Sequence, residues 1–186
     1  MVGIPSLWLP ILISAVLVFL VSFIIHSFLK YHQTDFGKLP DEQGVMDALR
    51  PFKISPADYV VPRAHSTKEI GSPEFKEKVE KGPVIYMTVL PNGVPSMTTS
   101  LIQWFIYLLV VGVFTAYITG RTIGPGAEYL AVFRIAGCTA FIGYALALWQ
   151  NSIWYKKSWS ATIKNTMDGL IYCLVTAGTF GWLWPE

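Results

Sequence analysis

Four long apolar runs constrain this chain more than any other feature of its sequence. They occupy residues 7–29, 101–119, 127–149 and 167–184. A helix needs about 20 residues to cross the hydrocarbon core of a bilayer, and the runs approach or exceed this length. Backbone groups in lipid must be satisfied within their own element, which favours helices over open strands. The sequence therefore predicts an all-α integral membrane protein with four transmembrane helices.

Composition supports the membrane class and excludes others. Hydrophobic residues make up 53% of the chain and charged residues only 14%, whereas a soluble domain carries about 25% charged residues. The net charge of +2 is too small to indicate a nucleic-acid partner. Cys138 and Cys173 lie inside apolar runs, so we expect free thiols packed as small apolar groups.

The distribution of basic residues predicts how the helices cross the membrane. The first run has no charge before Lys30, so it lacks the basic start of a signal peptide and is predicted to be an uncleaved anchor. Basic residues follow the first run and separate the third from the fourth, whereas Arg121 alone lies between the second and third. Cytoplasmic connections carry the excess of Lys and Arg. Both termini are therefore predicted on the non-cytoplasmic side, with residues 31–98 in the cytoplasm.

The connection at residues 31–98 differs from the rest of the chain. It contains eight Lys and Arg, nine Asp and Glu, and eight prolines, which stop long helices and central strands. We expect a long, mostly irregular connection with short helices at 41–49 and after Ser72, a predicted N-cap. Val84–Leu90 is a predicted strand, for which no clear partner strand is found in this chain.

This connection divides the chain into three predicted parts. They are an N-terminal anchor at 1–30, a proline-rich polar strap at 31–98 and a three-helix transmembrane unit at 99–186. The strap has three possible roles: a cover on the cytoplasmic face of the helices, an interaction arm that orders against another subunit, or a compact independent domain. Its few large apolar side chains favour the first two.

Arg134 and Asp168 are the charged residues inside the predicted spans that raise a functional question. Arg134 is expected in the outer half of the bilayer, where its stem reaches the headgroups or a neighbouring subunit; Glu186 is its expected partner within the chain. Asp168 is expected near the inner end of the fourth helix, on the order of 15 Å away in depth. Lys164 and the helix dipole are its expected stabilisers. A polar path for ions or a substrate is the alternative for both residues.

Small residues recur at intervals of four in the second and third spans. This spacing lets helices approach closely in lipid, so we expect the second, third and fourth helices to pack together. The first helix has few small residues and is expected to face lipid or a partner. The predicted packing residues are Gly112, Ala116, Gly120, Ala136, Ala140, Gly143 and Ala147.

The stretch "WQNSIWYKKSW" at 149–159 is amphipathic and basic. Its aromatic residues are typical of a membrane interface, and its lysines favour anionic headgroups. We expect contacts with lipid or another subunit from Trp154, Lys156, Lys157 and Trp159.

No pattern in the sequence predicts catalysis. His26 is the only histidine inside a span, so haem ligation by two histidines is not expected. No phosphate-binding loop, metal-ligand spacing or nucleophile motif is found, and neither a cofactor nor a metal is expected. The leading hypothesis is that the chain is a non-catalytic accessory or scaffold subunit of a larger membrane complex. Its expected partners are the lipid bilayer and other membrane subunits. The alternative is a small transporter or channel that uses Arg134 and Asp168.

Overall fold

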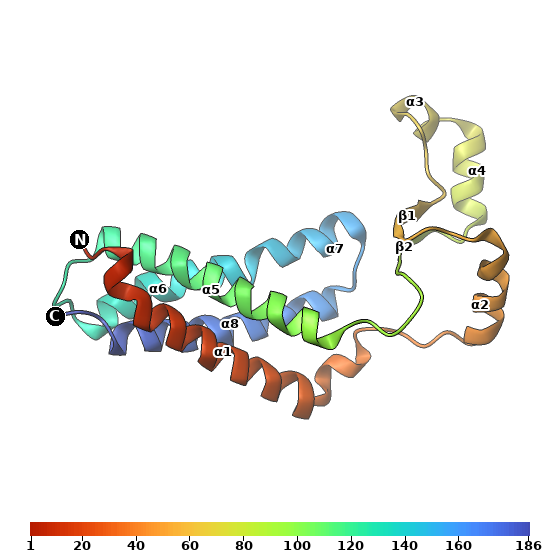
Figure 1. The fold of residues 1–186 in the computed structure, drawn as a ribbon. Coiled ribbons are helices and arrows are strands. Elements are labelled where there is room, and N and C mark those ends of the chain that lie inside the picture. Colours follow the sequence, from red (N-terminus) through yellow and green to blue (C-terminus); the bar gives the residue numbers. More distant parts are fainter. The chain divides into compact units, whose positions relative to one another are not determined.

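The chain forms two compact units in the computed structural model, which describes all residues 1–186 (Figure 1). Unit 1 combines Met1–Phe36 with Ser96–Glu186, and unit 2 is Gly37–Pro95. The N-terminal helix therefore belongs to the same unit as the C-terminal helices, in contrast to the three-part division expected from the sequence.

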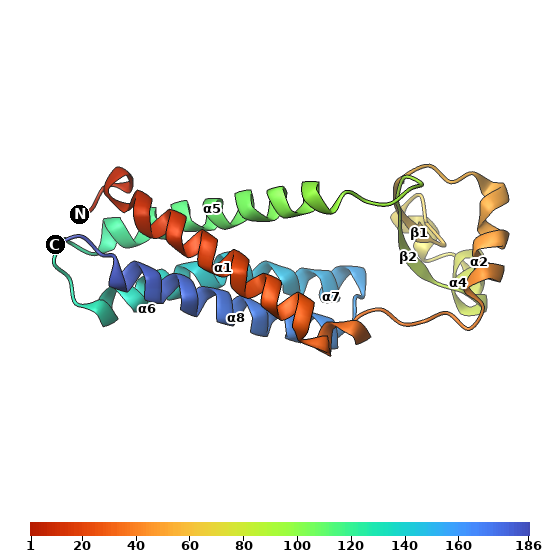
Figure 2. The same cartoon turned by 60° about the horizontal axis from the view of Figure 1, so that its bottom comes forward.

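Unit 1 is a bundle of four long helical segments. The segment α6 packs along α8, α1 packs against both α5 and α8, and α5 packs against α6 (Figure 2). Its elements are η1 (Ile4–Leu7), α1 (Trp8–Phe28), η2 (Lys30–Thr34), α5 (Met97–Thr122), α6 (Tyr129–Tyr144), η4 (Leu146–Leu148), α7 (Trp149–Tyr155) and α8 (Trp159–Trp182).

Three helical segments are long and apolar enough to cross a membrane: Ile4–Phe28, Met97–Thr122 and Tyr129–Tyr155. The third is distorted at Ala145, where α6 ends and the short η4 begins, and it extends beyond the expected end at 149. The helix α8 is 24 residues long but is not among the three. Its first half contains polar residues, and it begins at Trp159, well before the expected start at 167.

The first helix packs against α5 and α8 inside unit 1. The sequence instead predicts a helix that is separate from the other three and faces lipid or a partner. Gly112 and Gly120 of α5 make this approach possible. A Cβ atom at Gly112 would lie 3.1 Å from Ile11 Cγ2, and one at Gly120 would lie 2.3 Å from the Val2 carbonyl oxygen. The small residues of α5, including the buried Ala116 between these two glycines, therefore allow α1 to pack closely against α5.

Other small residues bring α6 and α8 together. A Cβ atom at Gly137 would lie 3.2 Å from Ala177 Cβ, and one at Gly169 would lie 2.9 Å from Ala145 Cβ. Ala136 and Ala140 are fully buried, as expected for packing residues. Gly143 is exposed but close to Val111 of α5, whereas Ala147 is exposed in η4. The expected spacing therefore fails at Ala147, because the helix is interrupted before it.

Unit 2 contains short elements and a two-stranded sheet, so it is more regular than expected. The Ser72 hydroxyl accepts a hydrogen bond from Phe75 N at 3.1 Å, which confirms the predicted N-cap. Its elements are α2 (Glu42–Leu49), η3 (Arg50–Phe52), β1 (Ala57–Val61), α3 (Thr67–Ile70), α4 (Pro73–Lys81) and β2 (Ile85–Val89).

The predicted strand does have a partner in this chain, so the sequence expectation was wrong on this point. The strand β2 pairs antiparallel with β1, with Ala57 opposite Val89 and Val61 opposite Ile85. The partner is short, lies between Pro56 and Pro62, and begins with small and acidic residues. These features conceal it from a reading based on hydrophobic alternation.

Unit 2 has no buried core. Not one of its residues is classed as buried, whereas unit 1 buries side chains along all four of its long segments. Large apolar side chains lie on the outside of unit 2, including Phe52 at 73% exposed and Val94 at 98%. Apolar burial is the main favourable contribution to folding, and this unit achieves little of it alone.

Candidate functional site

A polar cluster in unit 1 joins η2 to α8. The helix α1 ends at Phe28, and Leu29 adopts an extended conformation that turns the chain. The next residues then form η2, which lies against α8. We call this cluster the η2–α8 clamp, and it comprises Tyr31, His32, Asp35, Lys164 and Asp168.

His32 lies at the centre of the clamp. Its Nδ1 atom is 2.6 Å from Asp35 Oδ2, and its Nε2 atom is 2.8 Å from Asp168 Oδ2. Tyr31 donates its phenolic hydrogen to the other oxygen of Asp168. Because carboxylates only accept hydrogen bonds, His32 donates from both nitrogens and is an imidazolium in this arrangement. Asp168, 2% exposed, is thus fully satisfied inside the protein.

Lys164 completes the clamp from α8. Its Nζ atom donates to Asp35 Oδ1 at 2.8 Å, to the Tyr31 carbonyl oxygen at 2.6 Å and to Thr34 Oγ1 at 2.8 Å. Lys164 therefore binds Asp35 rather than Asp168, the partner expected from helical spacing. Two cations and two carboxylates balance within the clamp.

Electrostatics favour the charged forms of the clamp. Burial lowers the pKa of His32, but the hydrogen bonds to Asp35 and Asp168 outweigh it, so the pKa lies above its ordinary value. Burial raises the pKa of Asp35, but the bonds to Lys164 and His32 bring it below its ordinary value. Burial and the adjacent Asp168 carboxylate raise the pKa of the Tyr31 phenol, which stays protonated as a donor.

His26 stacks on His32, with ring centroids 4.9 Å apart and planes 7° from parallel. Nitrogen atoms of these two rings and a carboxylate oxygen of Asp168 lie within 4.8 Å of one another, close enough to suggest a metal site. A metal binds a histidine in the plane of its ring, and two parallel stacked rings do not direct lone pairs at a common point. Both nitrogens of His32 are also engaged by carboxylates. The geometry therefore suits a hydrogen-bonded, protonated His32 and does not suit a bound metal ion.

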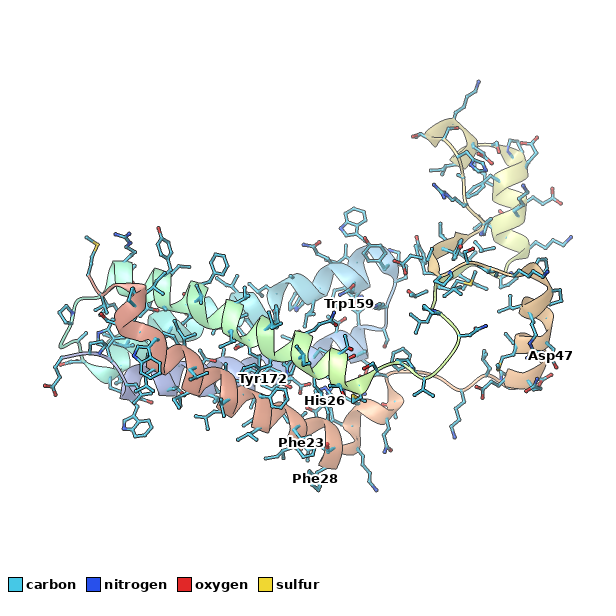
Figure 3. All side chains as sticks on the ribbon, viewed as in Figure 1. Phe23, His26, Phe28, Asp47, Trp159 and Tyr172 are labelled. Carbon is cyan, nitrogen blue, oxygen red and sulfur yellow. The ribbon has the colours of Figure 1, made fainter.

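A cavity of about 1000 Å³ lies beside the clamp in unit 1. Its lining comes from α1, α5, α8 and the α6–η4 region, and includes His26 and Asp168. Figure 3 labels Phe23 and His26 on α1 and Tyr172 on α8, three residues that line this cavity. We call this cavity the head pocket.

Four aromatic side chains form a closed ring in the wall of the head pocket. Trp104 stacks on Tyr107 with centroids 5.5 Å apart, and Tyr107 and Tyr144 meet edge to face with centroids 6.2 Å apart. Tyr144 contacts Tyr172 at 5.8 Å, and Tyr172 returns to Trp104 at 5.9 Å. We call this set the aromatic quartet. The Trp104 indole donates to Ser22 Oγ at 3.0 Å, which attaches the quartet to α1.

The residues predicted from sequence are dispersed over unit 1. Arg134 is exposed on α6 and forms no ion pair within the chain, neither with the exposed Glu186 nor with Asp168. The structure therefore does not bring Arg134 and Asp168 into one site.

The basic aromatic stretch lies on the outside of unit 1. Trp154, Lys156, Lys157 and Trp159 are all exposed around the turn between α7 and α8. This exposure leaves them accessible to lipid or another subunit.

Sequence reasoning missed most of the clamp and all of the aromatic quartet. His32 lies outside the predicted spans, just beyond the helix that carries His26, yet the turn at Leu29 folds it back onto His26. A signal was present: "YHQTD" at 31–35 places aromatic, imidazole and carboxylate groups just beyond a membrane helix. Polar groups at that depth need partners, and α8 supplies them.

Comparison with known proteins identifies no relative. No protein-family model, curated protein or solved structure matches this chain.

Proposed function

We propose that this chain is a non-catalytic accessory subunit of a larger membrane complex, with unit 1 as its membrane anchor and unit 2 as the segment that docks on another subunit. The observation that carries the proposal is the lack of any buried residue in unit 2. A unit of this size is marginal even with a core. Burial of its exposed apolar side chains against a partner would supply the missing stabilisation.

A protein partner suits unit 2 better than a lipid surface does. Residues 37–95 contain eight Lys and Arg and eight Asp and Glu, so the unit has no formal net charge. Attraction to anionic headgroups needs a cluster of unbalanced basic residues. A two-stranded sheet is also marginal alone and has two edges open to further strands. These features favour association with another protein chain.

The arrangement of unit 1 supports a fourth membrane span. The helix α8 runs beside α6, which belongs to one of the three apolar segments. Both termini lie at the same end of unit 1 in Figure 1, where Val2 N donates to Gly120 O and Gly126 N donates to Pro185 O. A chain that crosses the membrane an even number of times has both termini on the same side, as four spans would give. We place this end outside the cytoplasm and the connection at residues 31–98 inside.

The alternative role as a transporter or channel has less support. It was based on Arg134 and Asp168 lining one polar path, and the two share no contact. Asp168 has both oxygens occupied by Tyr31 and His32. Flux that depends on either residue in reconstituted vesicles would favour this alternative.

The mass of the gently extracted protein tests the proposal. We expect the chain to elute in mild detergent as part of a defined assembly with a fixed ratio of other membrane proteins. Replacing the exposed Phe52 and Ile70 by serine should release the chain while unit 1 stays folded. The matched control replaces the exposed Ile102 and Ile106 of α5 and should keep the assembly. A chain that is monomeric before any substitution would contradict the proposal.

Labelling of single cysteines tests the proposed topology. A cysteine at Ser158 should react only after the cytoplasmic side is opened to the reagent, whereas one at Glu186 should react from outside in intact cells. Both positions are at ends of α8 or beyond it. Reaction of both from the same side would show that α8 does not cross.

A further inference from the structure

We propose that the head pocket binds a neutral, membrane-soluble amphiphile with a flat, carbonyl-bearing head, the chemistry of an isoprenoid quinone, and that Tyr172 donates a hydrogen bond to this head. The proposal is independent of the accessory role described above. It rests on a hydroxyl without a partner, the aromatic quartet, an adjoining apolar groove and the local balance of charge.

The Tyr172 hydroxyl is the polar group in the head pocket that lacks a hydrogen-bond partner and could bind a ligand. Tyr172 lines the pocket and is 4% exposed, and its hydroxyl oxygen is buried with no hydrogen-bond partner in the chain. A buried hydroxyl without a hydrogen-bond partner destabilises the state that contains it. A carbonyl oxygen on a bound head would satisfy it. Neighbouring side chains cover this oxygen, so a head that binds there must displace them.

The aromatic quartet favours a flat head over a branched or tetrahedral one. Three of its four ring contacts are edge to face, and Trp104 stacks on Tyr107 with planes 24° apart, so ring faces and edges form the wall of the pocket. Flat conjugated groups stack well on such walls. The hydrogen bond from Trp104 to Ser22 holds the indole in place for this contact.

An apolar groove of about 400 Å³ continues from the head pocket between α1 and α5. The two cavities share Phe19 and Leu101 in their linings. Apart from Thr98, the residues of the second groove are apolar, among them Val16, Leu20 and Ile106. Because α1 and α5 are two of the apolar segments, this groove suits a hydrocarbon tail that enters from the bilayer.

The charges near the head pocket favour a neutral head. Asp168 is satisfied by Tyr31 and His32, and Lys164 is satisfied by Asp35. No unpaired cation is left in the lining to bind a phosphate group. His26 donates from Nδ1 to the Ser22 carbonyl at 3.0 Å, which leaves its Nε2 as an acceptor when the ring is neutral. A carbonyl or hydroxyl head complements these groups, and a phospholipid head does not.

Binding of decylubiquinone, a neutral benzoquinone with a decyl tail, tests the proposal on the full chain in nanodiscs. Quenching of tryptophan fluorescence reports binding, and empty nanodiscs correct for partition. We expect saturable quenching that is strongly reduced by Trp104→Phe. Decyl phosphate, with the same tail length and an anionic head, should not compete. Failure of the quinone to bind saturably, or equal competition by decyl phosphate, would overturn the proposal.

Substitutions separate a ligand contact from a structural role. Tyr172→Phe should weaken quinone binding about five- to tenfold, as expected for one neutral hydrogen bond, without lowering the melting temperature. Tyr117→Phe, on the exposed face of α5, is the matched control and should change neither quantity. Leu101→Trp, at the junction of the two cavities, should block binding. Unchanged affinity in both Tyr172→Phe and Leu101→Trp would place the ligand elsewhere and refute the assignment.

Discussion

His32 and Asp168 are separated by 136 residues in the sequence, yet His32 Nε2 lies 2.8 Å from Asp168 Oδ2. The contact fastens the segment that follows α1 to the helix that ends the chain. His32 is partly buried and Asp168 is almost completely buried, with 16% and 4% of their side-chain surfaces exposed. Loss of one partner from such a pair leaves a charge without compensation.

Asp168→Asn should therefore destabilise unit 1. The amide cannot accept from both Tyr31 and the His32 imidazolium as a carboxylate does, and we expect a loss of about 3 kcal/mol in unfolding free energy. Thermal unfolding in a mild detergent measures this loss. Asp47→Asn provides the control, because Asp47 pairs with Arg50 on the surface, at 52% exposed, where such pairs contribute little. Equal effects of the two substitutions would contradict the structural role of the clamp.

The clamp predicts that stability falls on both sides of a pH window. The pKa of His32 is raised on folding, so its contribution is complete below the unfolded pKa and is lost as the pH rises through the folded pKa. The pKa of Asp35 is lowered, so its contribution is complete above the unfolded pKa and is lost as the pH falls through the folded pKa. The contributions of His32 and Asp35 to stability are both complete between about pH 4 and pH 6.5.

Melting temperature as a function of pH checks this window. His32→Gln should remove the decline on the alkaline side, since the glutamine amide can still donate to one carboxylate but does not titrate. The acidic decline should persist in this variant because Asp35 still binds Lys164. An alkaline decline of the same size in His32→Gln would exclude His32 as its origin.

Gly169 should be intolerant of any side chain. A Cβ atom there would lie 2.9 Å from Ala145 Cβ, so α6 and α8 would have to separate. We expect Gly169→Ala to cost about 1–3 kcal/mol, as overpacked sites do. Gly178→Ala, in the same helix, is the matched control, because its nearest neighbour would be at 3.5 Å. That variant should be neutral or more stable, since alanine favours helices.

Arg134 should contribute little to the stability of the isolated chain. It is exposed on α6 and forms no ion pair within the chain. Arg134→Gln should leave the melting temperature of the purified protein unchanged. A drop as large as that of Asp168→Asn would instead place Arg134 in an internal contact.

Length and hydropathy were sufficient to predict the long helices, because both are local properties of the sequence. The cap at Ser72 was predictable for the same reason, and its side chain accepts a hydrogen bond from Phe75 N. Asp41, expected inside the helix at 41–49, caps it in the same way by accepting from Gly44 N. The early start of α8 was not predictable in this way. Its polar first half is compatible with its position because the segment that follows α1 supplies His32 and Asp35 as partners.

The candidate site depended on contacts between distant segments. The turn at Leu29 brings the His26 and His32 rings together, although the sequence places them in successive segments. Hydrophobic periodicity does not predict such a turn. The aromatic quartet takes Trp104 and Tyr107 from α5, Tyr144 from α6 and Tyr172 from α8. Each of them resembles an ordinary interfacial aromatic residue in the sequence. Only the packing of three helices brings them together.

We propose that unit 2 completes its folding against another subunit. Amide hydrogen exchange of residues 37–95, compared between native membranes and the purified chain, tests it most directly. We expect slow exchange of β1 and β2 amides in native membranes and fast exchange after the chain is purified alone, while α6 and α8 stay protected in both. Equal protection of β1 and β2 in the two states would contradict the claim, because unit 2 would then be stable without a partner.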